Sequence, residues 1–138
     1  MTTPYDAFHQ VDLRVGRVIR CEPHPAARKP AYKLWIDFGP VGILTSSAQL
    51  TALYQPPELE GRLVVAAVNL GSRSIAGFTS DALVLGADDE SGRVVLLSTD
   101  QDVPIGQRVY QREPYCWRGP SSPPITTSKV ERGRVTVK

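Results

Sequence analysis

A strict alternation of apolar and polar residues between positions 32 and 38 constrains the fold of this chain more than any other feature of its sequence. The apolar members are Tyr32, Leu34, Ile36 and Phe38, and the intervening residues are Lys33, Trp35 and Asp37. Successive side chains of a strand point to opposite faces of its sheet, so a period of two is typical of a half-buried strand. We therefore expect a strand with its apolar set in the core and Lys33 and Trp35 directed outward.

Further runs rich in β-forming residues lie on both sides of this segment. They cover residues 11–22, 41–44, 62–69, 82–86, 93–98 and 103–109 and are bounded by glycines, prolines or the acidic turn at 88–92. In the first run Val15, Ile19 and Cys21 are expected on the face that points into the core, and the alternation breaks around Gly16, where a bulge or a sharp bend is expected. The last run is expected to close the sheet.

One short helix is predicted before the first strand and another between later strands. Thr3 and Pro4 suit the cap and first turn of an N-terminal helix. Residues 47–54 carry apolar residues at helical spacing behind a serine, which predicts a helix that ends before Pro56. Short strands with one inserted helix and no alternation of strands and helices favour an all-β fold, a small barrel with Greek-key connections.

The 138 residues are expected to form one folded domain over residues 1–110. From Gln111 the chain is rich in proline, serine and basic residues and too poor in apolar ones to build a core. We expect residues 111–138 to be a separate basic tail, and the sequence leaves open whether it is disordered or lies along a sheet edge. The apolar runs are too short for a membrane span and the N-terminus does not resemble a secretory signal, so a cytoplasmic protein is expected.

Residues for catalysis or metal binding are scarce. The chain has two cysteines, Cys21 and Cys116, and two histidines, His9 and His24, without the spacing of a zinc site. In a reducing compartment we expect free thiols rather than a disulfide. No nucleophile with a neighbouring base and no phosphate or dinucleotide motif is evident, so neither enzymatic activity nor a cofactor is predicted.

The charges are unevenly distributed along the chain. Residues 12–33 contain six basic and two acidic residues, whereas residues 81–102 contain one basic and six acidic residues. The basic part includes the stretch PHPAARKPAYKLW, in which Arg28 and Lys29 precede the alternating strand. A basic region of this kind can attract phosphate groups even when the net charge is small.

Two segments favour a binding function. Lys33 can pair with phosphate, and Trp35 on the same outward face can stack on a base, contact another subunit or belong to a small secondary core. Residues 69–86 place Asn69, Arg73 and Ser80 among glycines that allow close approach of a ligand, although plain turns would show a similar composition.

Together with DLRVGRV at residues 12–18, these segments resemble the tRNA-binding domain that occurs as a free dimer and as an appendage of aminoacyl-tRNA synthetases. The likeness runs from about Phe8 to Tyr110. ARKPAYKLWIDFG, SSAQLTALY and AGFTSDALVLG are most similar to the CsaA-type family of export-related chaperones. The inserted ARKP loop and Ala82-Leu83, which stands where synthetase appendages have a glycine-methionine pair, set the chain apart from those appendages.

The resemblance implies a five-stranded oligonucleotide-binding (OB) barrel and a homodimer that binds tRNA or another structured RNA. The expected RNA contacts are Arg14, Lys33, Asn69, Arg73 and Ser80, joined on charge alone by Arg28 and Lys29. The rival function is a chaperone that holds unfolded precursor polypeptides in an apolar dimer groove, for which the candidate residues are Phe8, Trp35, Tyr54 and Phe78.

Overall fold

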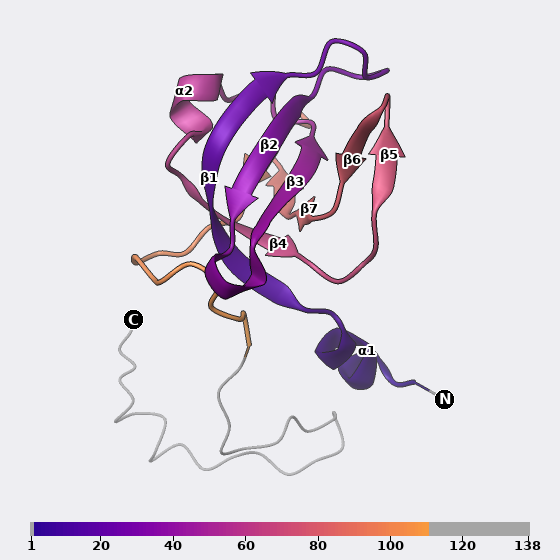
Figure 1. Ribbon diagram of the computed structural model, residues 1–138, viewed down its shortest axis with the longest axis vertical. Coiled ribbons are helices and arrows are strands. Elements are labelled where there is room, and N and C mark those ends of the chain that lie inside the picture. The colour runs from indigo at the N-terminus through magenta and orange to yellow at the C-terminus, as the bar shows by residue number, and fades with distance from the viewer. Residues whose placement is uncertain (1, 111–138) are drawn as a thin grey trace.

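Strand β1 (Leu13–Pro23) is the centre of a five-stranded antiparallel sheet that curls into a nearly closed barrel (Figure 1). The computed structural model describes residues 2–110. The first half of β1 pairs with β4 (Leu63–Ala67), and its second half pairs with β2 (Tyr32–Asp37). Strand β3 (Ile43–Ala48) extends the sheet beyond β2, and β7 (Leu83–Val84) extends it beyond β4. The predicted all-β, OB-type barrel of five strands is confirmed.

Main-chain hydrogen bonds close the barrel where regular strand pairing ends. The amides of Asp81 and Ala82, just before β7, both donate to the carbonyl oxygen of Thr45 on β3. Residues 106–109 run along the first half of β1, and the amide of Val15 donates to the carbonyl oxygen of Gln107 at 2.9 Å. The predicted closing segment therefore does lie on the sheet. It does not form a regular strand there, and Arg108 pairs with Arg14 in an isolated antiparallel bridge.

Gly16 lies inside the barrel at the point where β1 passes from one partner strand to the other. A β-carbon built there would lie 2.6 Å from Ile36 Cγ2 and 2.6 Å from Phe38 Cε1, well inside van der Waals contact. The register irregularity of β1 falls between Val18 and Arg20, slightly later than expected. This shift turns Ile19 toward solvent, whereas the alternating pattern had predicted that it faces the core.

The core is built mainly from the alternating residues of β2 and from β4. Leu34, Ile36 and Phe38 are completely buried, as the alternation predicted, and Val64 of β4 packs with them. Cys21 also belongs to this core, and its burial, with smaller contributions from Glu60 and Glu22, raises the pKa of its thiol to about 11. The Cys21 thiol is therefore protonated and unreactive near neutral pH.

Short elements surround the barrel. An N-terminal helix α1 (Pro4–Gln10) begins behind Thr3, whose hydroxyl accepts a hydrogen bond from the amide of Asp6, as the sequence predicted. The 3-10 helix η1 (Gly39–Val41) joins β2 to β3, and α2 (Pro56–Leu59) leads toward β4. Two hairpins complete the described chain: β5 (Arg73–Ile75) with β6 (Phe78–Ser80), and β8 (Gly86–Asp88) with β9 (Val94–Leu96).

The predicted helix over residues 47–54 is wrong. Ser47 and Ala48 continue β3 because they pair with Lys33 and Tyr32 of β2, and sheet pairing outweighs the local helical spacing. The residues that follow form turns, and the helix begins only at Pro56. A proline fits the first turn of a helix, where its missing N–H costs nothing, so Pro56 starts a helix instead of ending one.

Two sequence-based expectations concern features beyond the barrel. Within residues 2–110 no helix is long and apolar enough to cross a membrane. The predicted basic tail at 111–138 and Cys116 lie outside the described residues.

We expect Gly16→Ala to lower the free energy of unfolding by about 1–3 kcal/mol, because the added methyl group collides with Ile36 and Phe38 in a closely packed core. Urea denaturation followed by tryptophan fluorescence measures this loss. Ile19→Val, at an exposed position of the same strand, serves as a control and is expected to change stability by less than about 0.5 kcal/mol. Equal stability of Gly16→Ala and the parent chain would contradict the proposed crowding.

Candidate functional site

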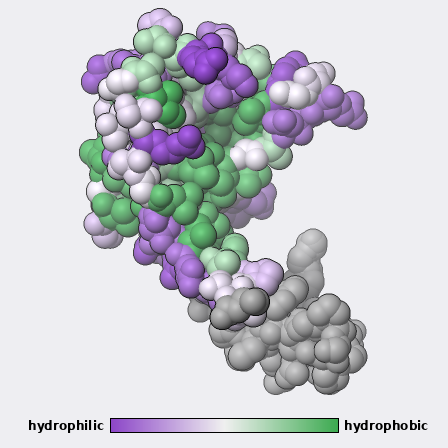
Figure 2. Space-filling model, turned by 90° about the vertical axis from the view of Figure 1, so that its right-hand side faces the viewer, coloured by the Kyte–Doolittle hydropathy of each residue, from purple (hydrophilic) through white to green (hydrophobic). Residues whose placement is uncertain are grey.

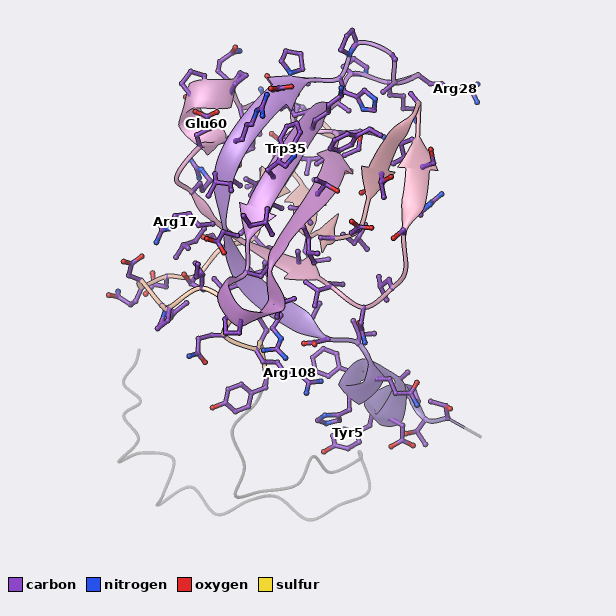
Figure 3. All side chains as sticks on the ribbon, viewed as in Figure 1. Tyr5, Arg17, Arg28, Trp35, Glu60 and Arg108 are labelled. Atoms are coloured by element: carbon purple, nitrogen blue, oxygen red, sulfur yellow. The ribbon has the colours of Figure 1, made fainter. Side chains whose placement is uncertain are left out.

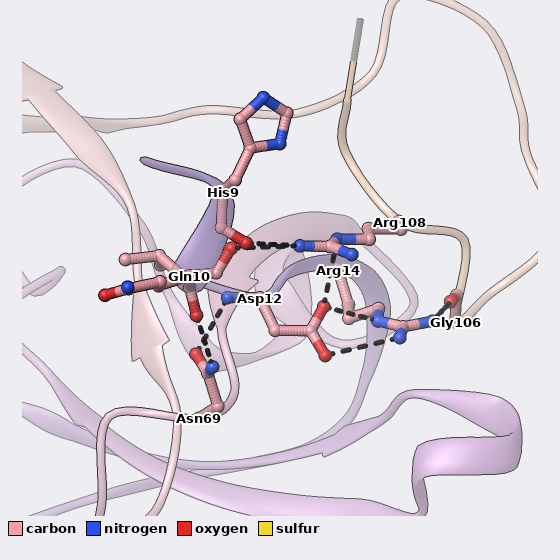
Figure 4. A network of polar contacts seen from close by, with 8 residues as sticks. His9, Gln10, Asp12, Arg14, Asn69, Gly106 and Arg108 are labelled. Atoms are coloured by element: carbon pink, nitrogen blue, oxygen red, sulfur yellow. Dashed lines mark hydrogen bonds and ion pairs between the residues drawn. The ribbon is translucent and has the colours of Figure 1, made fainter. Parts of the chain in front are cut away.

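A polar network at one end of the barrel joins four segments that are distant in the sequence (Figure 4). The Asp12 carboxylate accepts hydrogen bonds from Arg14 at 2.7 and 3.2 Å and forms an ion pair with Arg108 at 3.6 Å. The Asn69 side chain accepts from the Asp12 amide and donates to the carbonyl oxygen of Gln10, both at 2.8 Å. The network thereby ties the end of α1, β1, the loop after β4 and the last described segment together.

Two residues predicted to contact RNA, Arg14 and Asn69, belong to this network. The Arg14 guanidinium also donates to the carbonyl oxygen of Gly106 at 2.9 Å, and its side chain is only 28% exposed. Both amide atoms of Asn69 already have main-chain partners. These two side chains are therefore engaged in holding the fold, and we do not include them in the proposed RNA surface.

Trp35 lies on the outward face of β2, as predicted, but it is half-buried by its neighbours (Figure 3). The Arg20 guanidinium lies 4.7 Å from the centroid of the Trp35 ring, and the ring of Phe78 meets Trp35 edge to face at 5.5 Å. The ring centroids of Phe78 and His24 are 5.7 Å apart, and Lys33 Nζ lies 5.4 Å from the centroid of the Phe78 ring. This aromatic cluster attaches the β5–β6 hairpin to the barrel, so Trp35 belongs to a small secondary core.

The other two residues predicted for the groove lie in different places. Tyr54 is buried: its hydroxyl accepts from the Leu96 amide at 3.1 Å, and its carbonyl oxygen accepts from the Tyr32 hydroxyl at 2.8 Å. A side chain held in the core in this way does not line an outward groove. Phe8 is 51% exposed on α1, at the end of the molecule opposite the hairpin tip (Figure 1). The structure does not bring the four groove candidates together.

Polar contacts fasten the base of the β5–β6 hairpin to β3. The Ser80 hydroxyl accepts from the amide of Ser47 at 3.1 Å, so this predicted RNA contact also has a structural role. Ser47 Oγ lies 3.3 Å from His24 Nδ1, whereas the buried His24 Nε2 has no hydrogen-bond partner among the described residues. A serine nucleophile needs a histidine whose far nitrogen is oriented by a third group, so this pair lacks the geometry of a catalytic triad.

A cleft of about 760 Å³ separates the loop at residues 24–31 from the β5–β6 hairpin. Its lining includes Arg28 and Lys29 from the loop, Ser47 and Gln49 at the end of β3, and Ser74 and Ala76 from the hairpin. Figure 1 shows the loop and the hairpin tip meeting at one end of the barrel. On this side of the molecule, hydrophilic residues gather toward that end and hydrophobic surface covers the middle (Figure 2).

The remaining predicted RNA contacts lie in or beside this cleft. Arg28 and Lys29 are exposed, and Arg73 is exposed at the start of β5, next to the residues that line the hairpin wall. Lys33 lies half-buried beneath the hairpin, against Phe78. For Arg28, Lys29 and Arg73, no ion pair is found within residues 2–110. Two exposed cations, Arg28 and Lys29, therefore line the cleft, and a third, Arg73, precedes its lining residue Ser74 in the chain, a charge pattern that suits binding of a polyanion.

Sequence reasoning missed the cleft residues of β3 and of the hairpin, Ser47, Gln49, Ser74 and Ala76. A partial signal was present at Ala76-Gly77. Two short β-forming runs separated by two residues that include a glycine suit a hairpin. Arg20 was also missed, since its contact with Trp35 depends on the pairing of β1 with β2. Within residues 2–110, no three histidine, cysteine or acidic side chains are grouped to hold a metal ion.

Comparison with known proteins adds independent evidence. A family model described as "Putative tRNA binding domain" matches residues 13–108. The crystal structures of chaperone CsaA from Bacillus anthracis and of the CsaA chaperone protein from Picrophilus torridus are each 40% identical and cover 80% of this chain and 100% of theirs. Their TM-scores are 0.71 and 0.73.

A methionine–tRNA ligase from Pyrococcus abyssi is 38% identical over 109 residues, which make up 79% of this chain. The chain spans only 15% of the length of that ligase, so the likeness concerns a small part of the relative.

The polar network predicts that Arg14 and Arg73 differ in their effect on stability. Arg14→Ala removes charged hydrogen bonds to Asp12 and Gly106, and we expect it to lower the free energy of unfolding by about 1–2 kcal/mol. Arg73→Ala removes an exposed side chain and is expected to change it by less than about 0.5 kcal/mol. Chemical denaturation of both variants is the measurement, and equal losses would show that the network does not stabilise the fold.

Proposed function

The chain belongs to the tRNA-binding domain family, in its CsaA-type branch, and we propose that it is a non-enzymatic protein that binds tRNA or another structured RNA. The observation that carries this proposal is the pair of exposed cations Arg28 and Lys29 that line the cleft, with exposed Arg73 at the start of its hairpin wall. OB barrels bind nucleic acids on the face of their second and third strands and on the loops that flank it. Here the cleft lies between the β1–β2 loop and the hairpin inserted between β4 and β7.

The charge distribution supports the same face. The acidic residues of 81–102 include the turn of the β8–β9 hairpin, where hydrogen bonds from Arg93 lower the pKa of Asp89 and keep it ionised. A polyanion approaching the barrel is repelled by this hairpin and attracted to the basic cleft. A cytoplasmic location, where tRNA is abundant, is part of this proposal.

We further propose that the protein is a homodimer that buries α1. This helix has no buried residue, and it exposes Tyr5 and Phe8 although seven residues are too few for a stable isolated helix. Leu70 follows Asn69, which bonds to the end of α1, and Leu83 pairs with Ala67 nearby; both are more than half exposed. An exposed apolar surface of this kind is typical of a protein interface.

A second candidate function is the binding of unfolded precursor polypeptides. It is supported by the 40% identity to two structures of proteins described as chaperones. The site evidence for it is weaker, because Tyr54 is buried and Trp35 and Phe78 pack against each other under the hairpin. RNA binding therefore remains the leading proposal.

Affinity for tRNA is expected to come mainly from neutralised phosphates. With four to six contacts, the slope of log K against log salt concentration should be about −3 to −5. Replacing both Arg28 and Lys29 with alanine should reduce the magnitude of this slope by about 1.4–1.8, because each lost phosphate contact removes roughly 0.7–0.9 from it. Fluorescence anisotropy of labelled tRNA across a salt series measures both quantities.

Arg93→Ala is the control for this experiment, since Arg93 is paired with Asp89 in the acidic hairpin. The same reduction for Arg93→Ala, or a salt-independent affinity, would argue against the proposed surface. A reduced, unfolded polypeptide added as competitor separates the two candidate functions. If the parent chain binds the polypeptide but not tRNA below about 0.1 M salt, the second candidate replaces the first.

For the homodimer, light scattering after gel filtration should give twice the chain mass for the parent protein. Phe8→Asp places a charge in the proposed interface and should shift the protein to the monomer. Ala26→Asp, in the exposed loop at the opposite end of the molecule, should leave the dimer intact. A monomeric parent protein, or a dimer that survives Phe8→Asp, would contradict the role of α1.

A further inference from the structure

The cleft carries chemistry that charge attraction alone does not require. Beside Arg28 and Lys29 it is lined by Gln49 and by Ser74 of β5, and Ala27, Ala31 and Ile75 give it an apolar lining. Its volume of about 760 Å³ lies in the range of sites that enclose a small molecule or one unit of a polymer. A surface that only follows a phosphate backbone needs no hollow of this size.

Strand β5 offers a hydrogen-bonding edge to this cleft. Around the two-residue turn Ala76-Gly77, Ile75 pairs with Phe78 and Ser74 pairs with Thr79. Antiparallel pairs alternate between those that exchange hydrogen bonds and those that do not, and the pair that flanks a two-residue turn is bonded. Ser74 is therefore in a non-bonded pair, and its main-chain N–H and C=O point away from β6.

The outward groups of Ser74 have no other partner in the part of the chain that the structure describes. Among the main-chain hydrogen bonds outside the strands, none involves Ser74. One donor and one acceptor therefore lie side by side on a residue that lines the cleft. This is the pattern that a nucleobase edge complements, since each base carries neighbouring donors and acceptors.

The tip of the hairpin places a residue with a strained backbone on the wall of the cleft. Ala76 has φ 50°, in the left-handed region, which costs a residue with a β-carbon roughly 1–2 kcal/mol. Asparagine and glycine are the usual residues at this position of such a turn. Alanine here adds an apolar wall without a side chain that would fill the cleft or compete for the edge of β5. Strain of this kind occurs most often at ligand sites.

We propose that the cleft holds one unpaired nucleotide of the bound RNA. The phosphate of this nucleotide lies against Arg28 and Lys29, and the edge of its base bonds to the main-chain N–H and C=O of Ser74 and to the Gln49 amide. In a paired A-form helix the Watson–Crick edges are engaged and the bases stay stacked inside the duplex, so only an unpaired base can enter the cleft. This inference rests on the proposed RNA binding and names the part of the RNA that the site recognises.

The test compares Ser74→Pro with Ser74→Ala in the full chain. Proline removes the outward N–H, a position at which an edge strand tolerates it, whereas alanine removes only the hydroxyl. The probes are tRNA and a fully paired RNA hairpin of the same number of phosphates, closed by a chemical linker in place of a loop. We expect the parent chain and Ser74→Ala to bind tRNA at least tenfold more tightly than the paired hairpin. Ser74→Pro should lose most of this preference with an unchanged salt slope.

Ala27→Trp provides a second variant, because it fills the cleft from the opposite wall without touching the hairpin. It should abolish the preference for tRNA even if Ser74→Pro fails to fold. Retention of the preference in Ala27→Trp, or in a folded Ser74→Pro, would overturn the inference. Equal binding of both RNAs by the parent chain would overturn it too and leave the proposed function intact. Binding of neither RNA would refute the proposed function itself.

Discussion

The close contact of Ile36 and Phe38 with Gly16 is the constraint on which the rest of the barrel depends. Strand β1 serves two partners, β4 along its first half and β2 along its second half, so it must curve strongly between them. The inside of that curve has no room for a side chain, because the core residues of β2 occupy it. Glycine at this one position therefore allows a single strand to belong to both sides of the barrel. The closed barrel in turn brings the loop at residues 24–31 and the tip of the β5–β6 hairpin to the same end of the molecule.

The basic residues that the sequence suggested for RNA binding divide into two groups with different physical roles. Arg14 is enclosed by Asp12 and Gly106, and Arg108 joins the same carboxylate, so these charges are neutralised within the fold. Arg28, Lys29 and Arg73 lie on a loop and a hairpin, where the described residues offer them no acidic partner. A charge that is already paired gains little from a phosphate, whereas an unpaired charge gains the full attraction. The proposed RNA surface is therefore smaller, and lies further from β1, than a count of basic residues suggests.

The hairpin between β4 and β7 shows how the aromatic residues contribute. Trp35 and Phe78, with His24 and the cations Arg20 and Lys33, form a secondary core on the outer face of the sheet. This cluster holds the hairpin against the barrel and so positions the opposite wall of the cleft. The sequence suggested that these aromatic residues form an exposed surface for binding. In the structure the hairpin covers them, and they hold it in position. In the proposed RNA complex, their contribution is to hold the edge of β5 in place.

Local sequence patterns determined the strands of the barrel sheet, the N-terminal helix, the all-β class and the outward direction of Lys33 and Trp35, because alternation and capping depend on neighbours a few residues away. They did not predict the hairpin of β5 and β6. The same patterns failed at residues 47–54, where pairing with β2 replaced a helix, and at Ile19, where a shift in register reversed the side chain. Only the tertiary structure decided that Arg14, Asn69 and Ser80 serve the fold and that Tyr54 is buried. It also decided that Arg28, Lys29 and Ser74 face one cleft. Each of these outcomes depends on contacts between residues far apart in the chain, and no pattern within one segment of a sequence contains such a contact.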